Sequence, residues 1–171
     1  VGCDGAPDVI RQKLYDLYQT SKPLKIIDLG NCRKGNTIAE SYENLRSCVE
    51  QLAIYGKPIV VFGGTHEALC FLAKASFGKV QYPSVSIVDA KIDIDGEIED
   101  FSNRNYLHRL VEENQGMRLI HIANQEYLSS KDSFVWLARN NFVSFRLGEC
   151  NADITKSEPL TRDAQLVSLD M

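Results

Sequence analysis

The sequence contains no long apolar run, no excess of basic residues and no closely spaced pair of cysteines. None of the apolar runs approaches the roughly 20 residues that cross a bilayer, and the first residues contain no apolar signal core. The formal net charge is −4 and the Lys and Arg residues are scattered, so no surface for nucleic acid or for an anionic membrane is expected. We therefore predict a cytoplasmic protein that binds neither nucleic acid nor membrane.

The cysteines are few and lie far apart in the sequence. They are Cys3, Cys32, Cys48, Cys70 and Cys150, and no two of them form a C-x-x-C pair. An odd count with wide spacing argues against a disulfide framework and against a structural zinc site. We therefore expect most of them to be small buried apolar groups in a reducing cytosol.

The remaining composition is typical of one globular domain. The chain has 171 residues, of which 44% are hydrophobic and 25% charged, and this length can bury one sizeable core. It does not begin with Met, and it stops directly after a predicted strand, which is an unusual place for a complete fold to finish. We therefore expect a single α/β domain over residues 1–171 that is truncated at its C-terminus.

Short β-rich runs alternate with amphipathic helical runs along the chain. The predicted helices span residues 8–18, 38–55, 66–77, 103–113 and 129–140, and the predicted strands span residues 24–29, 58–62, 84–88, 118–122, 142–145 and 166–169. Apolar strands that alternate with helices predict an α/β fold with three layers, α-β-α, in which helices cover both faces of a mostly parallel sheet. The ligand site of such a fold lies at the carboxyl ends of its strands.

Three predicted strand ends carry side chains of the kind that bind metal ions. His66 follows a Gly-Gly turn, Asp89 and Asp93 flank Lys91, and Asp170 follows the last strand. A parallel sheet places all three ends on the same edge. One imidazole and three carboxylates form a hard, mainly oxygen site, which suits manganese or magnesium better than a metal that selects thiolates.

The order of these motifs resembles the ureohydrolase family, which includes arginase, agmatinase and formimidoylglutamase. Its G-G-x-H motif is matched by residues 63–66, its D-A-H-x-D motif by residues 89–93 except at Lys91, and the first half of its S-x-D-x-D motif by residues 168–170. Upstream, the family's entry pattern and its first D-x-G strand are matched by Pro7, Ile10, Arg11, Leu14 and residues 26–31.

The matched pieces cover nearly the whole chain in the family's order. The resemblance therefore implies the N-terminal two-thirds of an arginase-like domain. The last stretch, residues 146–171, looks like a divergent branch of the family found in Bacteroidetes-type bacteria.

The family's metal site implies ligand roles for the strand-end residues. Family members hold two manganese ions bridged by two carboxylates, so the resemblance assigns His66, Asp89, Asp93 and Asp170 to one ion, with Asp89 and Asp170 as the bridging groups. The second ion would need an imidazole at position 91 and a carboxylate just beyond Met171. A charged lysine has no lone pair and cannot coordinate as histidine does. We therefore expect manganese, with one ion favoured over two and a metal-free protein as a further outcome.

The resemblance also implies a reaction. It is the hydrolysis of a linear amidine carbon–nitrogen bond, in a guanidino or formimino small molecule, by a water that the metal activates. His108 resembles the position of the family's proton-shuttling histidine, and a homo-oligomer is expected. The alternative is a catalytically inactive relative kept as a binding or scaffold protein, because Lys91 is the kind of substitution that a degenerate enzyme shows. A third interpretation is an unrelated α/β binding module.

Each candidate residue also has a purely structural interpretation. His66 would be a histidine at a helix N-terminus, the aspartates would cap strand ends, and His108 would be a surface residue of its helix. His121, inside a predicted strand, is expected to be a hydrogen-bonded histidine of the core or the rim. The Gly-Gly turn and the D-A-x-x-D frame favour a site role for His66, Asp89 and Asp93.

Overall fold

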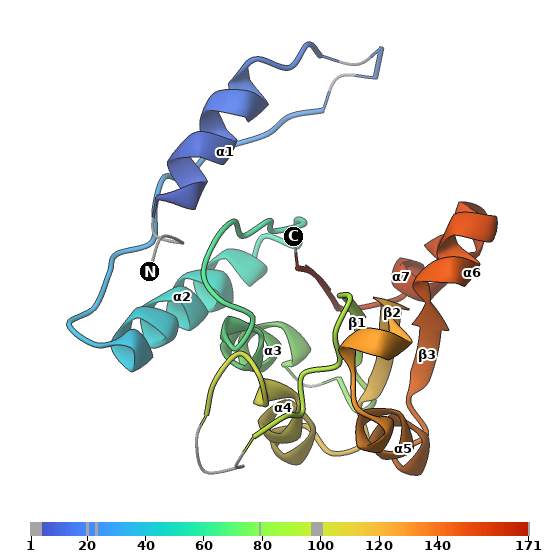
Figure 1. Cartoon of the computed structure of the whole chain (residues 1–171). Coiled ribbons are helices and arrows are strands. Elements are labelled where there is room, and N and C mark those ends of the chain that lie inside the picture. Colours follow the sequence, from blue (N-terminus) through green and yellow to red (C-terminus); the bar gives the residue numbers. More distant parts are fainter. Residues whose placement is uncertain (1–4, 20, 23, 79, 97–100, 171) are drawn as a thin grey trace.

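The computed structural model describes residues 5–19, 21–22, 24–78, 80–96 and 101–170. The helices are α1 (Ala6–Tyr15), α2 (Ile38–Ala53), α3 (Ala68–Phe77), α4 (Tyr106–Glu113), α5 (Lys131–Arg139), α6 (Leu147–Ala152) and α7 (Glu158–Arg162), with the 3-10 turns η1 (Glu126–Leu128) and η2 (Ile154–Lys156). The strands are β1 (Ser84–Val88), β2 (Arg118–Asn124), β3 (Val143–Arg146) and β4 (Leu166–Leu169). Figure 1 shows α1 and the segment after it projecting away from the rest of the chain.

The four strands form one parallel sheet in the order β3-β2-β1-β4. The chain starts in the middle of this sheet at β1, adds β2 and β3 on one side, and then returns to place β4 on the other side. In the β1–β4 pair, Val88 lies opposite Leu169. The residues that directly follow these two strands, Asp89 and Asp170, therefore come to neighbouring positions on the carboxyl edge.

Helices cover both faces of the sheet, as the sequence predicts. On one face, α3, α4 and α5 pack against Val85, Ile87 and Leu119 and form the larger core. On the other face, α6 and α7 pack against Ile120 and Ile122. Successive residues of β2 therefore point into the cores on opposite faces of the sheet, as expected of a strand, whose side chains alternate between its two faces. The three-layer α/β architecture is confirmed.

Two predicted strands are wrong. Residues 24–29 and 58–62 have no regular secondary structure and pair with no strand among the described residues, and their apolar side chains are exposed, including Ile27 at 80%. A continuous apolar run predicts a buried strand, yet a strand also needs a neighbour that satisfies its N–H and C=O groups. The local sequence indicates the apolar run, but it carries no information about whether a neighbouring strand is present.

Two further predictions need correction. The first helix begins at Ala6 rather than at residue 8, so Asp8 lies in its first turn. The segment between β3 and β4 contains α6, η2 and α7 rather than only a loop. There the Glu149 carboxylate accepts a hydrogen bond from the backbone N–H of Arg146, and this contact starts α6.

The described cysteines divide into two groups. Cys70 and Cys150 are buried, as expected, whereas Cys32 and Cys48 are exposed, which contradicts the expectation for these two. Cys3 lies outside the described residues. Within the part of the chain that the structure describes, no helix has the length and apolar character needed to cross a membrane.

Candidate metal centre

His66 is placed by a Gly-Gly turn at the carboxyl edge of the sheet. Gly63 and Gly64 both have positive φ angles, 90° and 87°, which side chains rarely adopt. The turn leads into α3, and it holds His66 just before the first helical residue, Ala68. The Gly-Gly pair therefore provides the backbone conformation that turns the His66 ring towards the ends of β1 and β4.

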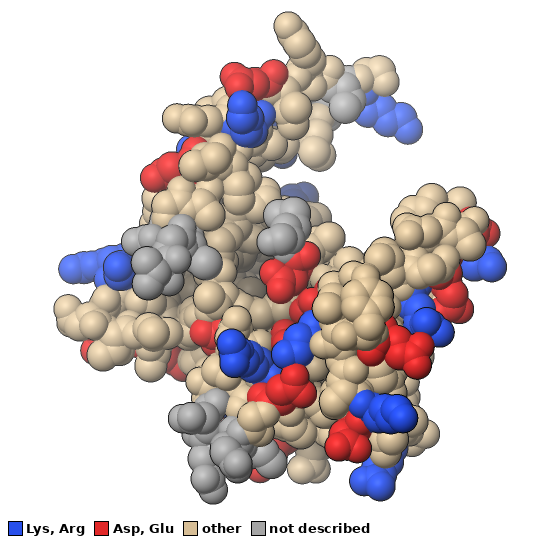
Figure 2. Space-filling view, viewed as in Figure 1, with Lys and Arg blue, Asp and Glu red and all other residues tan. Residues whose placement is uncertain are grey.

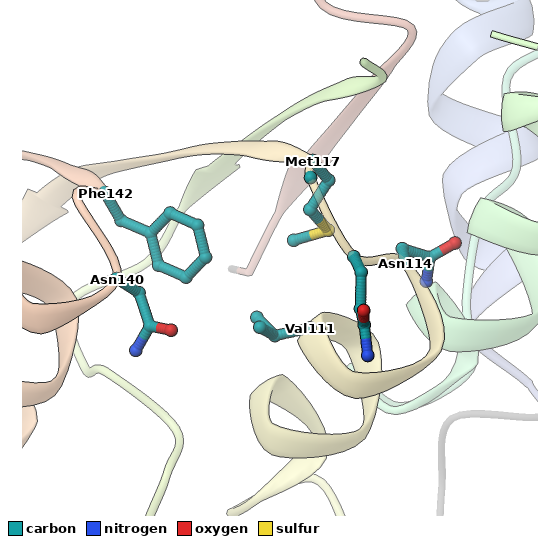
Figure 3. A pocket seen from close by; sticks show the side chains of 7 residues that line it. Val111, Asn114, Met117, Asn140 and Phe142 are labelled. Atoms are coloured by element: carbon teal, nitrogen blue, oxygen red, sulfur yellow. The ribbon is translucent and has the colours of Figure 1, made fainter. Parts of the chain in front are cut away.

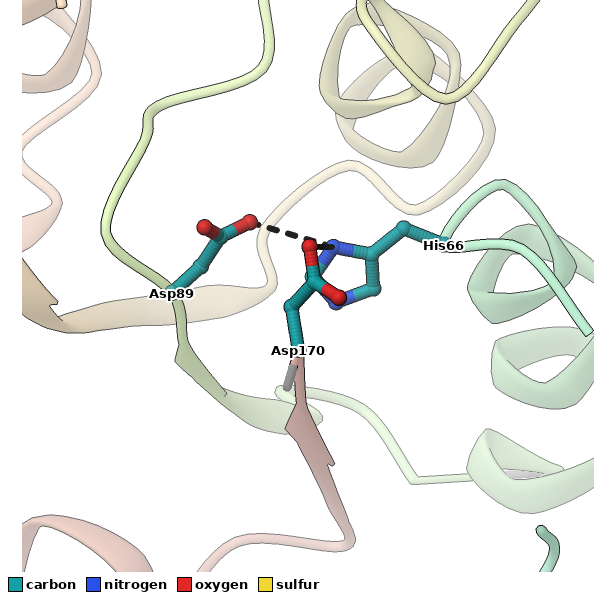
Figure 4. Close-up of side chains that lie close together, drawn as sticks. All are labelled: His66, Asp89 and Asp170. Atoms are coloured by element: carbon teal, nitrogen blue, oxygen red, sulfur yellow. Dashed lines mark ion pairs between the residues drawn. The ribbon is translucent and has the colours of Figure 1, made fainter. Parts of the chain in front are cut away.

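Three carboxylates approach the same nitrogen of His66. Its Nδ1 lies 3.2 Å from Asp89, 3.8 Å from Asp93 and 4.0 Å from Asp170. One ligand atom each from His66, Asp89 and Asp170 can be chosen so that all lie within 4.8 Å of one another. Figure 4 shows the two carboxylates, from the ends of β1 and β4, pointing at the ring. Asp93 lies beside this cluster, so the structure brings together all four residues that the sequence proposes as ligands.

The cluster has the features expected of a metal site. The Asp89 Oδ2 atom is buried, and its ion pair with His66 Nδ1 at 3.2 Å is the contact that a metal ion would replace. In the tautomer that leaves Nδ1 with a lone pair, His66 Nε2–H donates to Ser168 Oγ at 2.8 Å. A hydrogen bond of this kind fixes the ring of a metal-binding histidine. The donor set, one imidazole with carboxylates, fits manganese.

The charges of the cluster favour a cation. Burial lowers the pKa of His66, but the neighbouring carboxylates of Asp89, Asp93 and Asp170 outweigh it and raise this pKa to about 9. Burial raises the pKa of Asp93. Burial also acts to raise the pKa of Asp89, but His66 and the backbone N–H of Lys91 outweigh it and lower that pKa. In the metal-free protein the imidazolium is the cation of this site, and a metal ion has to displace its proton.

Tyr106 is a site residue that the sequence reasoning missed. Its side chain is fully buried, and its hydroxyl lies 3.4 Å from His66 Nδ1. Burial and the charges of the nearby aspartates raise the pKa of Tyr106, so the phenol stays protonated and can donate. Its position on the apolar face of α4 gave no signal in the sequence. The sequence did contain a signal for Ser168. It lies two residues before Asp170, and side chains two residues apart in a strand point to the same face.

Lys91 does not place its ammonium among the carboxylates of the cluster. Its Nζ lies 2.8 Å from Asp95, while its backbone N–H donates to Asp89 Oδ1 at 2.9 Å. The lysine backbone therefore holds the carboxylate, and the lysine charge is paired further along the same loop. This geometry favours neither a coordinating role for Lys91 nor a contact with His66.

His108 and His121 each bind a backbone carbonyl. His108 Nε2 lies 3.2 Å from the carbonyl of Ile94, and its ring packs edge-on against Trp136. No contact of His108 with His66 or with the cluster carboxylates is found among the described residues, so its role as a proton shuttle stays a prediction. His121 is 1% exposed, its Nε2 lies 3.0 Å from the carbonyl of Lys91, and its Nδ1 has no partner.

Replacing Ser168 with alanine should weaken manganese binding about 10- to 100-fold, the usual cost of losing the partner of a ligand. The change removes the oxygen that orients His66 Nε2. Isothermal titration calorimetry measures the affinity of each variant for manganese. Ser86→Ala is the matched control, because its hydroxyl donates to the carbonyl of Leu160, which lies on the opposite face of the sheet. Equal affinities of the two variants would contradict the role of Ser168.

His121 should make the protein sensitive to acid. Burial lowers its pKa from 6.5 to about 4. Below pH 6.5 the unfolded chain therefore binds a proton at this histidine, whereas the folded protein does not bind it until about pH 4. The free energy of unfolding falls between these two pH values. The full difference corresponds to about 3 kcal/mol. His121→Gln, which keeps a donor for the carbonyl of Lys91, should lose this component in urea unfolding at pH 7 and pH 4.5. A variant with an unchanged pH dependence would show that another group is responsible.

Two hollows in the surface of the described residues lie at opposite edges of the sheet. One, with a volume of about 240 Å3, lies beside Met117 and Phe142, just before β2 and β3 begin (Figure 3). The other, about 260 Å3, is lined by Asn124, Tyr127 and Arg146 at the carboxyl ends of the same strands. Only the second shares the edge that carries His66. In the space-filling view, acidic side chains gather near the centre of the face where β4 ends (Figure 2).

The fold and the site together define a class of protein. It is a three-layer α/β protein with a candidate site for a divalent metal at the carboxyl edge of a parallel sheet. Residues 1–162 match the model of the Arginase family. The chain therefore belongs to the arginase family, and the resemblance seen in the sequence is confirmed.

Solved structures of this family share the fold. Formiminoglutamase of Trypanosoma cruzi with Mn2+ is 16% identical, with a TM-score of 0.84 over 99% of this chain and 78% of that chain. Formimidoylglutamase of Bacillus subtilis is 21% identical, with a TM-score of 0.78 over 99% of this chain and 60% of that chain. Agmatine ureohydrolase of Thermoplasma volcanium is 19% identical, with a TM-score of 0.74 over 98% of this chain and 59% of that chain.

The chain is thus shorter than these relatives, and it spans 60% of the Bacillus subtilis protein. No curated protein matches it. A divalent metal such as manganese is suggested by the Mn2+ of the Trypanosoma cruzi structure and by the His66, Asp89 and Asp170 group.

Proposed function

We propose that this protein is a ureohydrolase-like, metal-dependent hydrolase that cleaves the carbon–nitrogen bond of a linear amidine, in a guanidino or formimino compound. The observation that carries this proposal is the convergence of His66, Asp89 and Asp170 within 4.8 Å at the carboxyl edge of the sheet. Membership of the arginase family and the Mn2+-containing structural relative support it.

The protein's own residues supply the binding of the ion and its orientation. His66 Nδ1 and the carboxylates of Asp89, Asp93 and Asp170 would hold manganese, and Ser168 would keep the imidazole in the binding tautomer. A bound manganese ion supplies Lewis acidity that lowers the pKa of a water and polarises the amidine. Tyr106 offers a protonated hydroxyl beside the imidazole, and the exposed side of the Asp170 carboxylate leaves the site open to a small molecule.

The position of Lys91 favours one ion over two. Its ammonium is paired with Asp95, so it cannot replace the imidazole that a second ion needs. His108 stays our candidate for proton transfer, by its resemblance to the shuttle position. The cytoplasmic location and the homo-oligomer stay predictions from the sequence.

The second candidate function is that of an inactive relative that binds a small molecule or acts as a scaffold. Lys91 favours this alternative, because a site with one ion polarises its substrate less than a pair does. The two functions predict the same fold and differ in turnover.

The test is to measure metal content and hydrolysis on the full-length protein. We expect about one manganese ion per chain, as the single complete ligand set implies, and slow release of urea from guanidino compounds or of formamide from formimino compounds. A protein that binds the ion without turnover of either class supports the inactive relative. A protein that binds no divalent metal contradicts the hydrolase proposal.

A further inference from the structure

Two cysteines that lie apart in the sequence are neighbours in the structure. Cys32 Sγ and Cys48 Sγ are 3.8 Å apart, and both residues are exposed. Cys48 lies in α2, and Cys32 lies in the segment before this helix. The other described cysteines, Cys70 and Cys150, are buried in the cores on opposite faces of the sheet.

The segment that follows Cys32 is fixed against α2 by several contacts. The carbonyl of Arg33 accepts a hydrogen bond from Asn44 Nδ2 at 3.1 Å, and the backbone N–H of Gly35 donates to Ser41 Oγ at 3.0 Å. A side chain at Gly35 would collide with Glu40, so this close approach requires glycine. The proximity of the two sulfurs therefore follows from a defined loop that packs on the helix.

We propose that Cys32 and Cys48 form an intramolecular disulfide when the protein meets an oxidising small-molecule disulfide. Closing the bond requires the sulfurs to approach from 3.8 Å to about 2.05 Å. Rotation of two exposed side chains can supply most of this movement while the contacts of Arg33 and Gly35 persist. The proposal concerns a modification site and does not depend on hydrolytic activity.

The chemistry is thiol–disulfide exchange in two steps. The thiolate of one cysteine attacks a sulfur of the small disulfide, forms a mixed disulfide and releases one small thiolate. The second cysteine thiolate then attacks the protein sulfur of the mixed disulfide and releases the other small thiolate. The protein gives up two electrons and two protons, and one small disulfide is reduced to two small thiols.

The environment of Cys32 affects the rate of this reaction. Partial burial and the neighbouring Cys48 sulfur raise the pKa of the Cys32 thiol. The attacking thiolate is therefore scarce at neutral pH, and oxidation should be faster in alkaline buffer. Such a pair suits a bond that forms slowly and persists better than it suits a rapid sensor.

The bond would brace the helix that supports the metal centre. The Tyr42 hydroxyl of α2 lies 2.6 Å from Thr65 Oγ1 and donates to Glu67, and these two residues flank His66. A disulfide between Cys32 and Cys48 closes a loop that begins before this helix and ends at Cys48 within it. Closing a loop of this size should raise the melting temperature by roughly 6–12 °C.

The experiment uses the full-length protein with Cys3→Ser, so that the cysteine outside the described residues takes no part. The protein is incubated with oxidised glutathione at alkaline pH, alkylated, digested and analysed by peptide mass spectrometry. We expect a cross-linked peptide pair that joins Cys32 to Cys48, a monomer on a non-reducing gel, and a rise in melting temperature that dithiothreitol reverses.

Two variants provide the matched controls. Cys32→Ser and Cys48→Ser should each retain a single glutathione on the remaining cysteine and show no rise in melting temperature. Glutathione on both cysteines of the parent protein without a cross-link would overturn the proposal. Cross-links between chains, or no modification at all, would also overturn it.

Discussion

Replacing Asp89 with asparagine should reduce the affinity of the full-length protein for manganese by at least about 100-fold, because losing a ligand costs more than losing its outer partner. Asp89 lies at the centre of the cluster, and its buried Oδ2 atom is 3.2 Å from His66 Nδ1. Asparagine keeps the shape of the side chain and its acceptor for the backbone N–H of Lys91, but it removes the negative charge that holds the cation.

The affinity is measured by isothermal titration calorimetry with manganese, and the metal content is measured by elemental analysis. Asp132→Asn is the matched control, since it makes the same chemical change in the exposed first turn of α5. Both variants should be compared at the same neutral pH, because the raised pKa of His66, about 9, makes a proton compete with manganese. If Asp89→Asn bound manganese as tightly as Asp132→Asn, the proposed metal centre would be wrong.

Replacing Lys91 with histidine should raise the manganese content of the full-length protein from about one ion per chain to about two, and it should increase amidine hydrolysis at least about tenfold, as expected of a two-metal clamp. The backbone N–H of residue 91 already donates to Asp89 Oδ1, so an imidazole at this position starts beside the Asp89 carboxylate. The change removes the ion pair of Lys91 with Asp95. This pair is partly exposed and contributes about 0–1 kcal/mol to the free energy of unfolding. Folding should therefore be preserved.

Lys91→Met is the matched control, because it removes the ammonium without adding a ligand. It should leave the ion count at about one, as the unchanged ligand set implies. A second ion in both variants would show that the lysine charge, and not the missing imidazole, limits binding. One ion in both would contradict the assignment of position 91 to a second metal site. Ion binding without turnover in all three proteins would favour the inactive relative.

Several features of the site could be predicted from local sequence. The ends of β1 and β4 were predicted at the residues where the structure has them, because an apolar run stops there and an aspartate follows. The Gly-Gly pair before His66 indicated a turn, and the two positive φ angles confirm that only a glycine-rich turn fits. Alternation of strands with helices predicted a parallel sheet, and a parallel sheet gathers its strand ends at one edge.

Other features depended on which segments meet. Residues 24–29 and 58–62 have the composition of buried strands, but no described strand lies beside them. Whether a segment forms a strand depends on a neighbouring strand, which its own residues do not specify. The wide spacing of the cysteines argued against a disulfide framework, whereas the loop after Cys32 brings it next to Cys48. The Lys91 ammonium pairs with Asp95, four residues further along the chain.

The three-layer α/β class could be predicted from the period of apolar residues, which depends on a few consecutive residues. The family could be predicted from the order of its motifs, and the same motifs proposed His66, Asp89, Asp93 and Asp170 as ligands. Three features could not be predicted in this way: the place of β4 beside β1, the contacts of Ser168 and Tyr106 with His66, and the ion pair of Lys91. Those outcomes depend on strand order and on contacts between distant segments, which the free energy of the whole fold selects.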